Sequence, residues 1–276
     1  MIHNACHKKI IPPEQCATAG IDCNQGSMLK VFHCDIHRTM HVPYSVISAD
    51  LSNCYDAVNH AVATLALLAF GVPHMAVKLV LTCLQSMYFW LRTAFGISGT
   101  PFHGTAVNPF FGISQGGGFA PPSFQAVSAL MINSYKSFGH GVQYVSPVTG
   151  LIFFFAAVLY VEDTDLLLRA ESPTTPDEEF FAKIQTAVTD WARIVLMTGG
   201  SLKAPKCHTC IARIRFVGGV AKMKRKRALP SVQITVPQKD GPPKAIDVIE
   251  PTESKRTLRV TTNLAGDEGS TRVHPW

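Results

Sequence analysis

The sequence predicts a mixed α+β fold, because it contains both β-rich runs and segments of helical pattern. One run covers residues 44–50, and a second covers 151–161 and is followed by a short run over 164–169. Asp50 ends the first run, and Glu162 and Asp163 end the second. A buried strand gains nothing from stacked negative charge, so acids at the strand ends indicate a functional site.

Turn and cap signals divide the rest of the chain into elements. Pro121 and Pro122 suit the first turn of a helix, and acids at 177–179 suit the amino terminus of another. Gly199-Gly200 should end that helix. In chain order we expect a helix over 57–70, a helix over 74–87, paired strands within 88–111, a glycine-rich turn over 112–118, a helix over 122–135, a hairpin of 151–161 with 164–169, a helix over 176–197 and a strand over 207–216.

Composition indicates a globular protein with a slight preference for polyanions. The 276 residues are 47% hydrophobic and only 16% charged, and the net charge is +6. The eight cysteines show no disulfide spacing and no signal peptide opens the chain, so we expect an intracellular protein with reduced thiols. The longest apolar runs, 61–72 and 151–161, are shorter than the roughly 20 residues that span a bilayer, which argues against a membrane protein.

Composition also divides the chain into three parts. Residues 1–37 are rich in Cys, His and Pro, and residues 38–219 contain the periodic elements. From residue 220 the chain becomes basic and then polar and proline-rich, so we place a boundary near 219.

The acids at the strand ends predict a divalent-metal site. If the two strands pair, their carboxylates converge and repel one another unless a cation lies between them. Two ions in such a site can hold the attacking and leaving oxygens of a phosphoryl transfer. We therefore expect Asp50, Glu162 and Asp163 to bind Mg²⁺ or Mn²⁺. The alternative for Asp50 is a helix cap, since a helix begins soon after it.

Five segments together resemble the motifs of a known polymerase family. Asp50-Leu-Ser-Asn-Cys-Tyr-Asp56, Gln115-Gly-Gly-Gly-Phe-Ala-Pro121 and Tyr160-Val-Glu-Asp163 are similar to the first palm motif, the second, and the Tyr-x-Asp-Asp box of reverse transcriptases. Trp191 with residues 199–207 resembles the motif after that box, and residues 257–260 with Gly266-Asp267 faintly resemble the primer grip. The resemblance covers roughly residues 11–270 and points to the non-LTR retroelement kind.

This resemblance implies a right-hand polymerase palm, an antiparallel sheet backed by helices, with the 151–169 hairpin beside the Asp50 strand. Residues 1–37 would be a partial fingers remnant, 38–219 the palm and 220–276 a connection toward a thumb. The implied activity is RNA-directed DNA synthesis by two-metal nucleotidyl transfer. The implied partners are an RNA template, a DNA primer and deoxynucleoside triphosphates.

Family motifs also imply roles for individual residues. Asp50 would be the shared metal ligand beside the Leu51 carbonyl, and Tyr55 would exclude a 2′-hydroxyl, unless it is simply a half-buried tyrosine. Gln115 and Gly116 would let the backbone approach a template base or nucleotide closely, although a flexible loop is the alternative. Lys206 would donate a proton to the departing pyrophosphate, or is a solvated lysine. For Asp56 we expect a structural role as an N-cap.

Three departures from the family pattern leave more than one function open. Glu162 stands where the family has Asp, Arg259 stands where the primer grip has Gly, and only 49 residues precede Asp50, so most of the fingers segment is expected to be missing. The chain is then either a polymerase fragment or a decayed remnant that keeps the fold and at most binds nucleic acid. A metal-dependent nuclease or phosphatase is a third reading, but it would not need Tyr55 or the Gln115 turn.

Two further groups of residues carry weaker predictions. The basic run formed by Lys222, Lys224, Arg225, Lys226 and Arg227 could hold phosphates, serve as a nuclear address or be a solvated surface. A zinc site is the less favoured reading of the cysteines and histidines, because their spacings are irregular. They are Cys6, His7, Cys16, Cys23, His33, Cys34, His37, Cys207 and Cys210.

Overall fold

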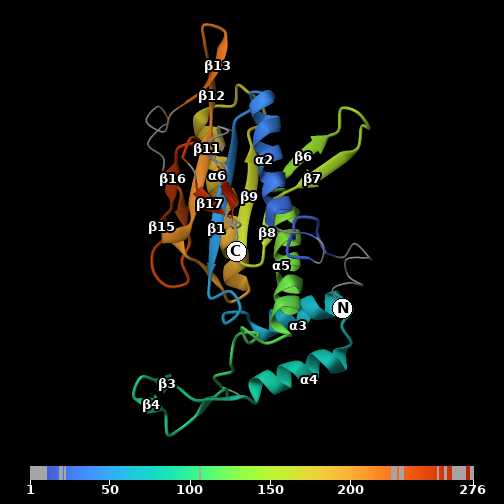
Figure 1. Cartoon of the computed structure of the whole chain (residues 1–276), viewed down its shortest axis with the longest axis vertical. Coiled ribbons are helices and arrows are strands. Elements are labelled where there is room, and N and C mark those ends of the chain that lie inside the picture. Colours follow the sequence, from blue (N-terminus) through green and yellow to red (C-terminus); the bar gives the residue numbers. More distant parts are fainter. Residues whose placement is uncertain are drawn as a thin grey trace.

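The computed structural model of the chain describes most of its residues and is shown in Figure 1. The described residues are 11–18, 21, 23–105, 107–224, 229, 233–253, 255–257, 260–262 and 272–273.

A mostly antiparallel sheet forms the centre of the fold (Figure 1). Its strand order is β16-β11-β1-β9-β8; β11 and β16 run parallel, and β10 extends the sheet by pairing with the end of β1. The strands are β1 (Tyr44–Ser52), β8 (Ala157–Tyr160), β9 (Asp163–Arg169), β10 (Ser201–Leu202), β11 (His208–Ala212) and β16 (Asp247–Ile249).

Alternation along β1 sends its side chains into two separate cores. Ile47, Ala49 and Leu51 belong to a large core with residues of α3 (His60–Ala69), α5 (Ala120–Ser137) and α6 (Asp177–Met197). Tyr44 and Val46 belong to a smaller core with Cys34 of α2 (Cys23–Thr39). Helices therefore cover both faces of the sheet, as expected for a strand that is buried along most of its length.

All four expected helices are present near their expected bounds. The predictions over 57–70, 74–87, 122–135 and 176–197 correspond to α3, to α4 (His74–Gln85), to α5 and to α6. Prolines lie in the first turn of α5 and acids in the first turn of α6, as predicted. The assignment of Asp56 as an N-cap was wrong, because Asn59 caps α3 by accepting a hydrogen bond from the Ala61 amide. Helix α2 was not predicted, and it crosses the boundary placed between residues 37 and 38.

Two of the expected strands divide in two. The run 151–161 becomes β7 (Ile152–Phe155) and β8, because the chain changes partner at Ala156: β7 pairs with β6 (Val142–Val145), whereas β8 pairs with β9. The run 207–216 becomes β11 and β12 (Ile214–Val217), and β12 forms a hairpin with β13 (Val220–Met223). A continuous hydrophobic run predicts a strand but does not reveal a change of partner.

The paired strands expected within 88–111 are present and form an arm that projects beyond α4 (Figure 1). The remaining strands form small separate sheets. The arm strands are β2 (Tyr88–Phe89), β3 (Arg92–Thr93), β4 (Gly96–Ile97) and β5 (Phe102–His103), and the others are β14 (Thr235–Val236), β15 (Lys244–Ala245), β17 (Lys255–Thr257), β18 (Val260–Thr262) and β19 (Arg272–Val273).

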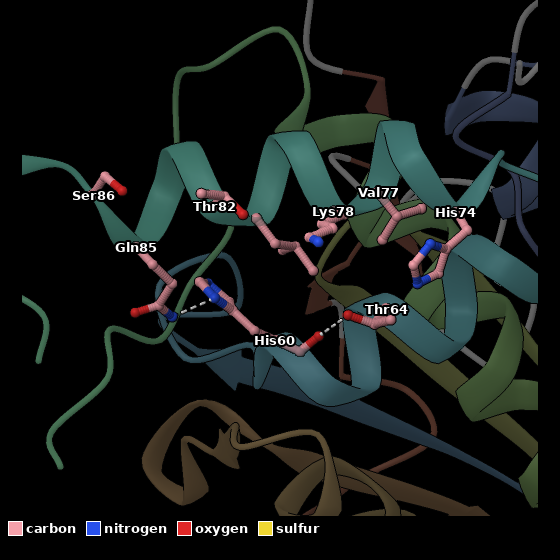
Figure 2. Close-up of a pocket in the computed structure, with 9 residues that line it drawn as sticks. His60, Thr64, His74, Val77, Lys78, Thr82, Gln85 and Ser86 are labelled. Atoms are coloured by element: carbon pink, nitrogen blue, oxygen red, sulfur yellow. Dashed lines mark hydrogen bonds between the residues drawn. The ribbon is translucent and has the colours of Figure 1, made fainter. Parts of the chain in front are cut away.

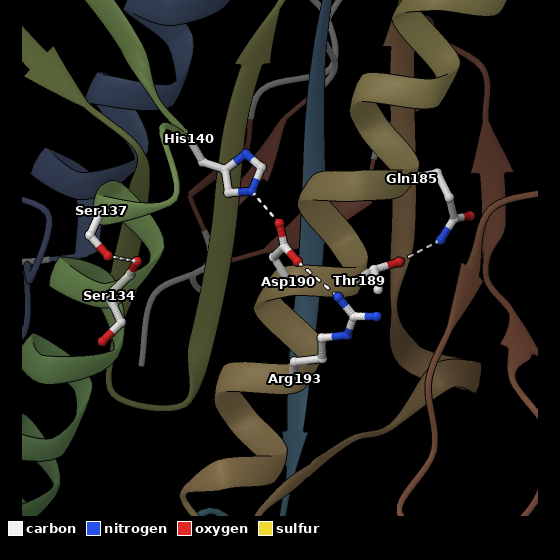
Figure 3. Close-up of polar contacts among 7 residues, drawn as sticks. All are labelled: Ser134, Ser137, His140, Gln185, Thr189, Asp190 and Arg193. Atoms are coloured by element: carbon white, nitrogen blue, oxygen red, sulfur yellow. Dashed lines mark hydrogen bonds and ion pairs between the residues drawn. The ribbon is translucent and has the colours of Figure 1, made fainter.

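A polar contact joins the segment that follows α5 to α6. His140 Nε2 lies 2.8 Å from Asp190 Oδ2, and the His140 ring stacks on Tyr135 at a centroid distance of 4.5 Å. Arg193 adds a longer contact to the same carboxylate at 3.4 Å (Figure 3). This arrangement gives the imidazole a hydrogen-bond partner and places it between Tyr135 of α5 and Asp190 of α6.

The cysteines with described side chains are unpaired thiols. In the described part of the chain, no helix is long and apolar enough to cross a bilayer.

Two buried histidines pack between α2 and the sheet. The rings of His33 and His37 lie 4.5 Å apart, both residues are 1% exposed, and His33 Nδ1 lies 2.5 Å from the Tyr144 hydroxyl of β6. Burial, and then the neighbouring His37, hold the pKa of His33 well below its usual range. Burial also lowers the pKa of His37. Both rings are therefore neutral in the folded chain at neutral pH.

We expect this pair to make the fold sensitive to acid. The unfolded chain protonates both rings near pH 6.5 and the folded chain does not, so the free energy of unfolding should fall as the pH drops below about 6.5. The measurement is the change in Tm between about pH 7.5 and about pH 5.5. The His33→Phe/His37→Phe variant should show a smaller change, whereas the exposed His103→Gln control should behave like the native chain. Equal changes in all three would contradict the prediction.

Candidate active site

The antiparallel register of β1 and β9 places two of the predicted acids opposite one another. Asp50 pairs with Asp163, and Ser48 pairs with Asp165 two residues along. Directly paired residues share a face of the sheet, so all four lie on the face that carries α2. They line a cleft of about 450 Å³ together with Glu162 and Lys206.

Glu162 lies in a tight turn with a strained backbone. Tyr160 pairs with Asp163, so only Val161 and Glu162 connect β8 to β9. Val161 has a φ of 57°, in the left-handed region that a β-branched residue rarely adopts. Such a conformation costs on the order of 1–3 kcal/mol and is found most often at functional sites. The predicted hairpin is confirmed, with Glu162 in its loop and Asp163 as the first residue of β9.

Asp50 and Glu162 have different partners. Lys206 Nζ lies 3.2 Å from Asp50 Oδ2, an oxygen that is buried and makes no hydrogen bond with a described residue. The Cys54 thiol contacts Glu162 Oε2 at 3.9 Å, and burial followed by the charge of Glu162 raises the pKa of Cys54 to about 12. Glu162 is thereby in contact with the loop that leaves β1. The neutral thiol donates a weak hydrogen bond to the carboxylate.

The cleft presents hard oxygen donors, which are the ligands that Mg²⁺ and Mn²⁺ prefer. Within the described ranges, however, no three His, Cys, Asp or Glu side chains lie close enough together to form a metal-ligating group. The acids of the predicted site thus line one cleft, but their side chains do not converge on a common coordination position. Metal binding by Asp50, Glu162 and Asp163 stays a prediction.

Lys206 reaches the cleft from the segment that follows α6. This segment pairs with the end of β1 through Leu51 and Leu202, and the Lys203 amide donates to the Asp50 carbonyl at 2.9 Å. A short 3-10 turn, Ala204–Lys206, then directs Lys206 toward Asp50. The Lys206 side chain is 61% exposed, so its ammonium group remains mobile and solvated despite the ion pair.

Tyr55, Gln115 and Gly116 lie on neighbouring loops and do not line the cleft. Tyr55 is half-buried against Phe124, with ring centroids 5.2 Å apart. Its carbonyl accepts a hydrogen bond from the Ile113 amide at 2.8 Å, which ties the two loops together. Gly116 has a φ of 88° and a Cβ there would touch nothing within 4 Å, so this turn requires glycine for its backbone angle.

The basic run lies largely outside the described residues. Arg225, Lys226 and Arg227 belong to that undescribed part, and Lys222 is exposed on β13. Lys224 is paired with Asp177 at 3.2 Å. Phosphate binding by this run stays a prediction, and the pairing of Lys224 counts against its participation.

A buried ion pair beside the predicted acids was missed. Lys30 Nζ of α2 lies 3.0 Å from Asp165 Oδ2, and both side chains are almost completely buried. Ser48 donates a hydrogen bond to the other oxygen of Asp165. The sequence signal was an acid directly before the three leucines 166–168, inside the expected strand 164–169, but nothing in the sequence pointed to Lys30 as its partner. His208 and Asp247 also line the cleft and were missed.

We predict that Lys30→Met lowers the free energy of unfolding by about 3–5 kcal/mol, because it leaves the buried Asp165 carboxylate without its cation. The Lys30→Met/Asp165→Asn variant should recover much of this loss, since it removes both charges and keeps an oxygen acceptor for Ser48. Urea unfolding measures the effect. Lys183→Met is the matched control: its exposed pair with Glu171 should contribute less than about 1 kcal/mol. Equal losses in Lys30→Met and Lys183→Met would contradict the prediction.

Comparison with known proteins identifies the fold. No protein-family model matches the sequence, and no curated protein is significantly similar to it. Among solved structures, the chain is similar to apo telomerase from Candida tropicalis truncated from its C-terminal domain, with a TM-score of 0.54 and 9% identity over 95% of this chain and 42% of that one. It is also similar to telomerase from Candida albicans in complex with the TWJ fragment of telomeric RNA, with a TM-score of 0.51 and 10% identity over 95% of this chain and 35% of that one. The chain thus spans less than half the length of these telomerases, and its α+β fold is like that of reverse transcriptases.

Proposed function

We propose that the chain is the palm, with partial fingers, of an RNA-directed DNA polymerase that originated in a non-LTR-type retroelement. The observation that carries the proposal is the pairing of Asp50 with Asp163 in a cleft that Glu162 and Lys206 also line. The reverse-transcriptase-like fold supports it, and in this fold Asp50 and Asp163 lie on paired strands of the central sheet, with Glu162 and Lys206 on adjoining turns. The substrates would be an RNA template, a DNA primer and deoxynucleoside triphosphates.

Asp50, Glu162 and Asp163 would hold Mg²⁺ or Mn²⁺. Their carboxylates fit such ions in donor type, and Asp50 Oδ2, which is buried and ion-paired with the exposed Lys206 ammonium at 3.2 Å, would accept a metal ion when Lys206 moves away. When bound, the ions would lower the pKa of the primer 3′-hydroxyl and stabilise the charge that develops on the phosphate.

Other residues of the chain would bind and orient the nucleotide. Lys206 would leave Asp50, which its exposure allows, and donate a proton to the departing pyrophosphate. The ring of Tyr55 would lie against the sugar and exclude a 2′-hydroxyl by steric contact. The Gln115-Gly116 turn, which is joined to the Tyr55 loop through Ile113, would approach the base pair, and the Leu51 carbonyl would face the metal site.

A specific observation favours a second function, a remnant that keeps the fold and at most binds nucleic acid. Glu162 contacts Cys54 at 3.9 Å, and its additional methylene places its carboxylate on the order of an ångström from where an aspartate carboxylate would lie. An error of that size can lower the rate of a preorganised site about 100-fold. Under this reading the substitution would have abolished a former activity.

The deciding test is primer extension on an RNA template with Mg²⁺ or Mn²⁺. We predict that Glu162→Asp raises the extension rate by up to about 100-fold, because it restores the shorter side chain. Asp50→Asn is the inactive control, and circular dichroism verifies that each variant is folded. Extension by the native chain at a rate equal to that of Glu162→Asp would mean that Glu162 is a competent ligand. Failure of every variant, with duplex binding retained, would favour the remnant.

A second test separates the polymerase from a metal-dependent nuclease that uses the same carboxylates. In an active chain, Tyr55→Ala should increase ribonucleotide incorporation relative to deoxynucleotide incorporation, because the ring that excludes the 2′-hydroxyl is removed. The measurement is the ratio of kcat/KM for the two nucleotides, with Phe216→Ala, at an exposed ring outside the cleft, as the aromatic control. Metal-dependent cleavage that Tyr55→Ala leaves unchanged would support a nuclease instead.

A further inference from the structure

The chain contains no acidic residue between Asp56 and Glu162. This stretch forms α3, α4, the arm, α5 and the β6–β7 hairpin, and it carries Lys78, Arg92 and Lys136. Any surface built from these elements alone is neutral or positive. Such a surface favours an anionic ligand over a cationic one.

A groove of about 420 Å³ lies between α3 and α4 within this stretch (Figure 2). His74, Lys78, Thr82 and Ser86 follow one another along α4 at intervals of four residues and all line the groove. Residues four apart lie on one face of a helix and are separated by about 6 Å along it. The four side chains therefore form a row of polar groups about 18 Å long.

Lys78 supplies the positive charge of this row. Among the described residues its ammonium group has no ion pair or hydrogen bond, and no acid lines the groove. Thr82 and Ser86 add hydroxyl donors, and His74 adds an exposed imidazole. A lysine flanked by neutral donors and without a carboxylate is a suitable site for a phosphate group.

His60, on the α3 side of the groove, has a structural role. Its Nε2 donates to the Gly112 carbonyl at 2.6 Å, and its Nδ1 accepts from the Gln85 amide at 2.6 Å (Figure 2). Gln85 also bonds both backbone polar groups of Phe110, at 2.9 and 3.2 Å. These contacts hold the base of the arm against α3 and α4, and the first arm strand begins two residues after Ser86 of the groove.

The arm continues the row with exposed aromatic rings. Tyr88 is 57% exposed, Trp90 54% and Phe95 100%, and Arg92 lies between the last two. Tyr88 packs against His103 of the opposite strand, with ring centroids 4.9 Å apart, but remains more than half exposed. Isolated exposed apolar residues are common, but several large exposed rings close together on a small arm are not. Aromatic rings next to a basic groove are the arrangement on which single-stranded nucleic acids stack their bases.

We propose that the α3–α4 groove and the arm bind a single strand of nucleic acid. Lys78, His74 and Thr82 would contact its phosphates, and Tyr88 and Trp90 would stack on its bases. The proposal rests on the proposed function in taking nucleic acid as the ligand. The groove and the cleft share no lining residue, so the strand would lie outside the cleft. The segment that follows the arm is joined to the Tyr55 loop through Gly112 and Ile113.

Fluorescence anisotropy with a single-stranded RNA oligonucleotide, in the absence of divalent metal and nucleotide, tests the groove. Lys78→Glu should weaken binding by about tenfold or more, since it removes a charged phosphate contact and adds repulsion. Lys239→Glu, at an exposed lysine outside the groove, makes the same change in net charge and should have a much smaller effect. For Lys78→Ala, the slope of log K against log salt concentration should decrease by about 0.7.

The arm is tested at high salt, where stacking dominates the affinity. Trp90→Ser should weaken binding by about tenfold, a typical loss for one stacked base. Phe216→Ser, at a ring of similar exposure on β12, should leave the affinity unchanged.

Three results would overturn the proposal. One is an equal loss in Lys78→Glu and Lys239→Glu, which would indicate non-specific attraction. Another is displacement of the RNA by millimolar inorganic pyrophosphate from the native chain but not from a Lys78 variant. That result would assign the groove to a free phosphate compound. The third is the absence of RNA binding by the folded native chain together with self-association that Trp90→Ser abolishes, which would assign the arm to protein contact. Because the assay needs no catalysis, an inactive cleft would leave its outcome intact.

Discussion

The candidate site depends on the antiparallel register of β1 with β9. This register sets Asp50 against Asp163 and Ser48 against Asp165 on one face of the sheet. A shift by one residue would turn these side chains into the large core beneath α5 and α6, at a prohibitive cost in buried charge. The Lys30–Asp165 ion pair supports the register, because it neutralises the carboxylate that lies deepest and attaches α2 to the sheet at that point. The acids that remain in the cleft are then the ones nearest the strand ends.

Two close backbone contacts hold the loop that follows β1. Gly112 and Gly199 both have positive φ angles. A Cβ at Gly112 would lie 2.8 Å from the backbone of Asp56, and a Cβ at Gly199 would lie 2.3 Å from the backbone of Ala57. The loop is therefore packed between the base of the arm and the end of α6. The Cys54 contact with Glu162 joins the same loop to the strained β8–β9 turn. The base of the arm, the end of α6 and the β8–β9 turn therefore all contact this one loop.

Two regions of the chain differ in charge and therefore suit ligands of opposite charge. The acids of the cleft suit cations, whereas the stretch from residue 57 to residue 161 has no acid and suits phosphates. In our proposals the two regions contact different parts of one substrate, the reacting phosphate with its ions and the single strand beside it. The alternation of sign along the chain would thus separate two tasks that require opposite charge.

The sequence by itself determined the α+β class, the main helices, and the acids at the ends of the β-rich runs, because periodicity, capping residues and buried charge are local signals. The tertiary structure alone decided which strands pair, and hence that the run 151–161 divides at Ala156 between two partners. It also decided that Lys30 neutralises Asp165 across 135 positions and that Glu162 contacts Cys54. Helix α2 had weak periodicity, so its place was set by the sheet it covers. These features require contacts between distant segments, whose free energy depends on packing that no local pattern encodes.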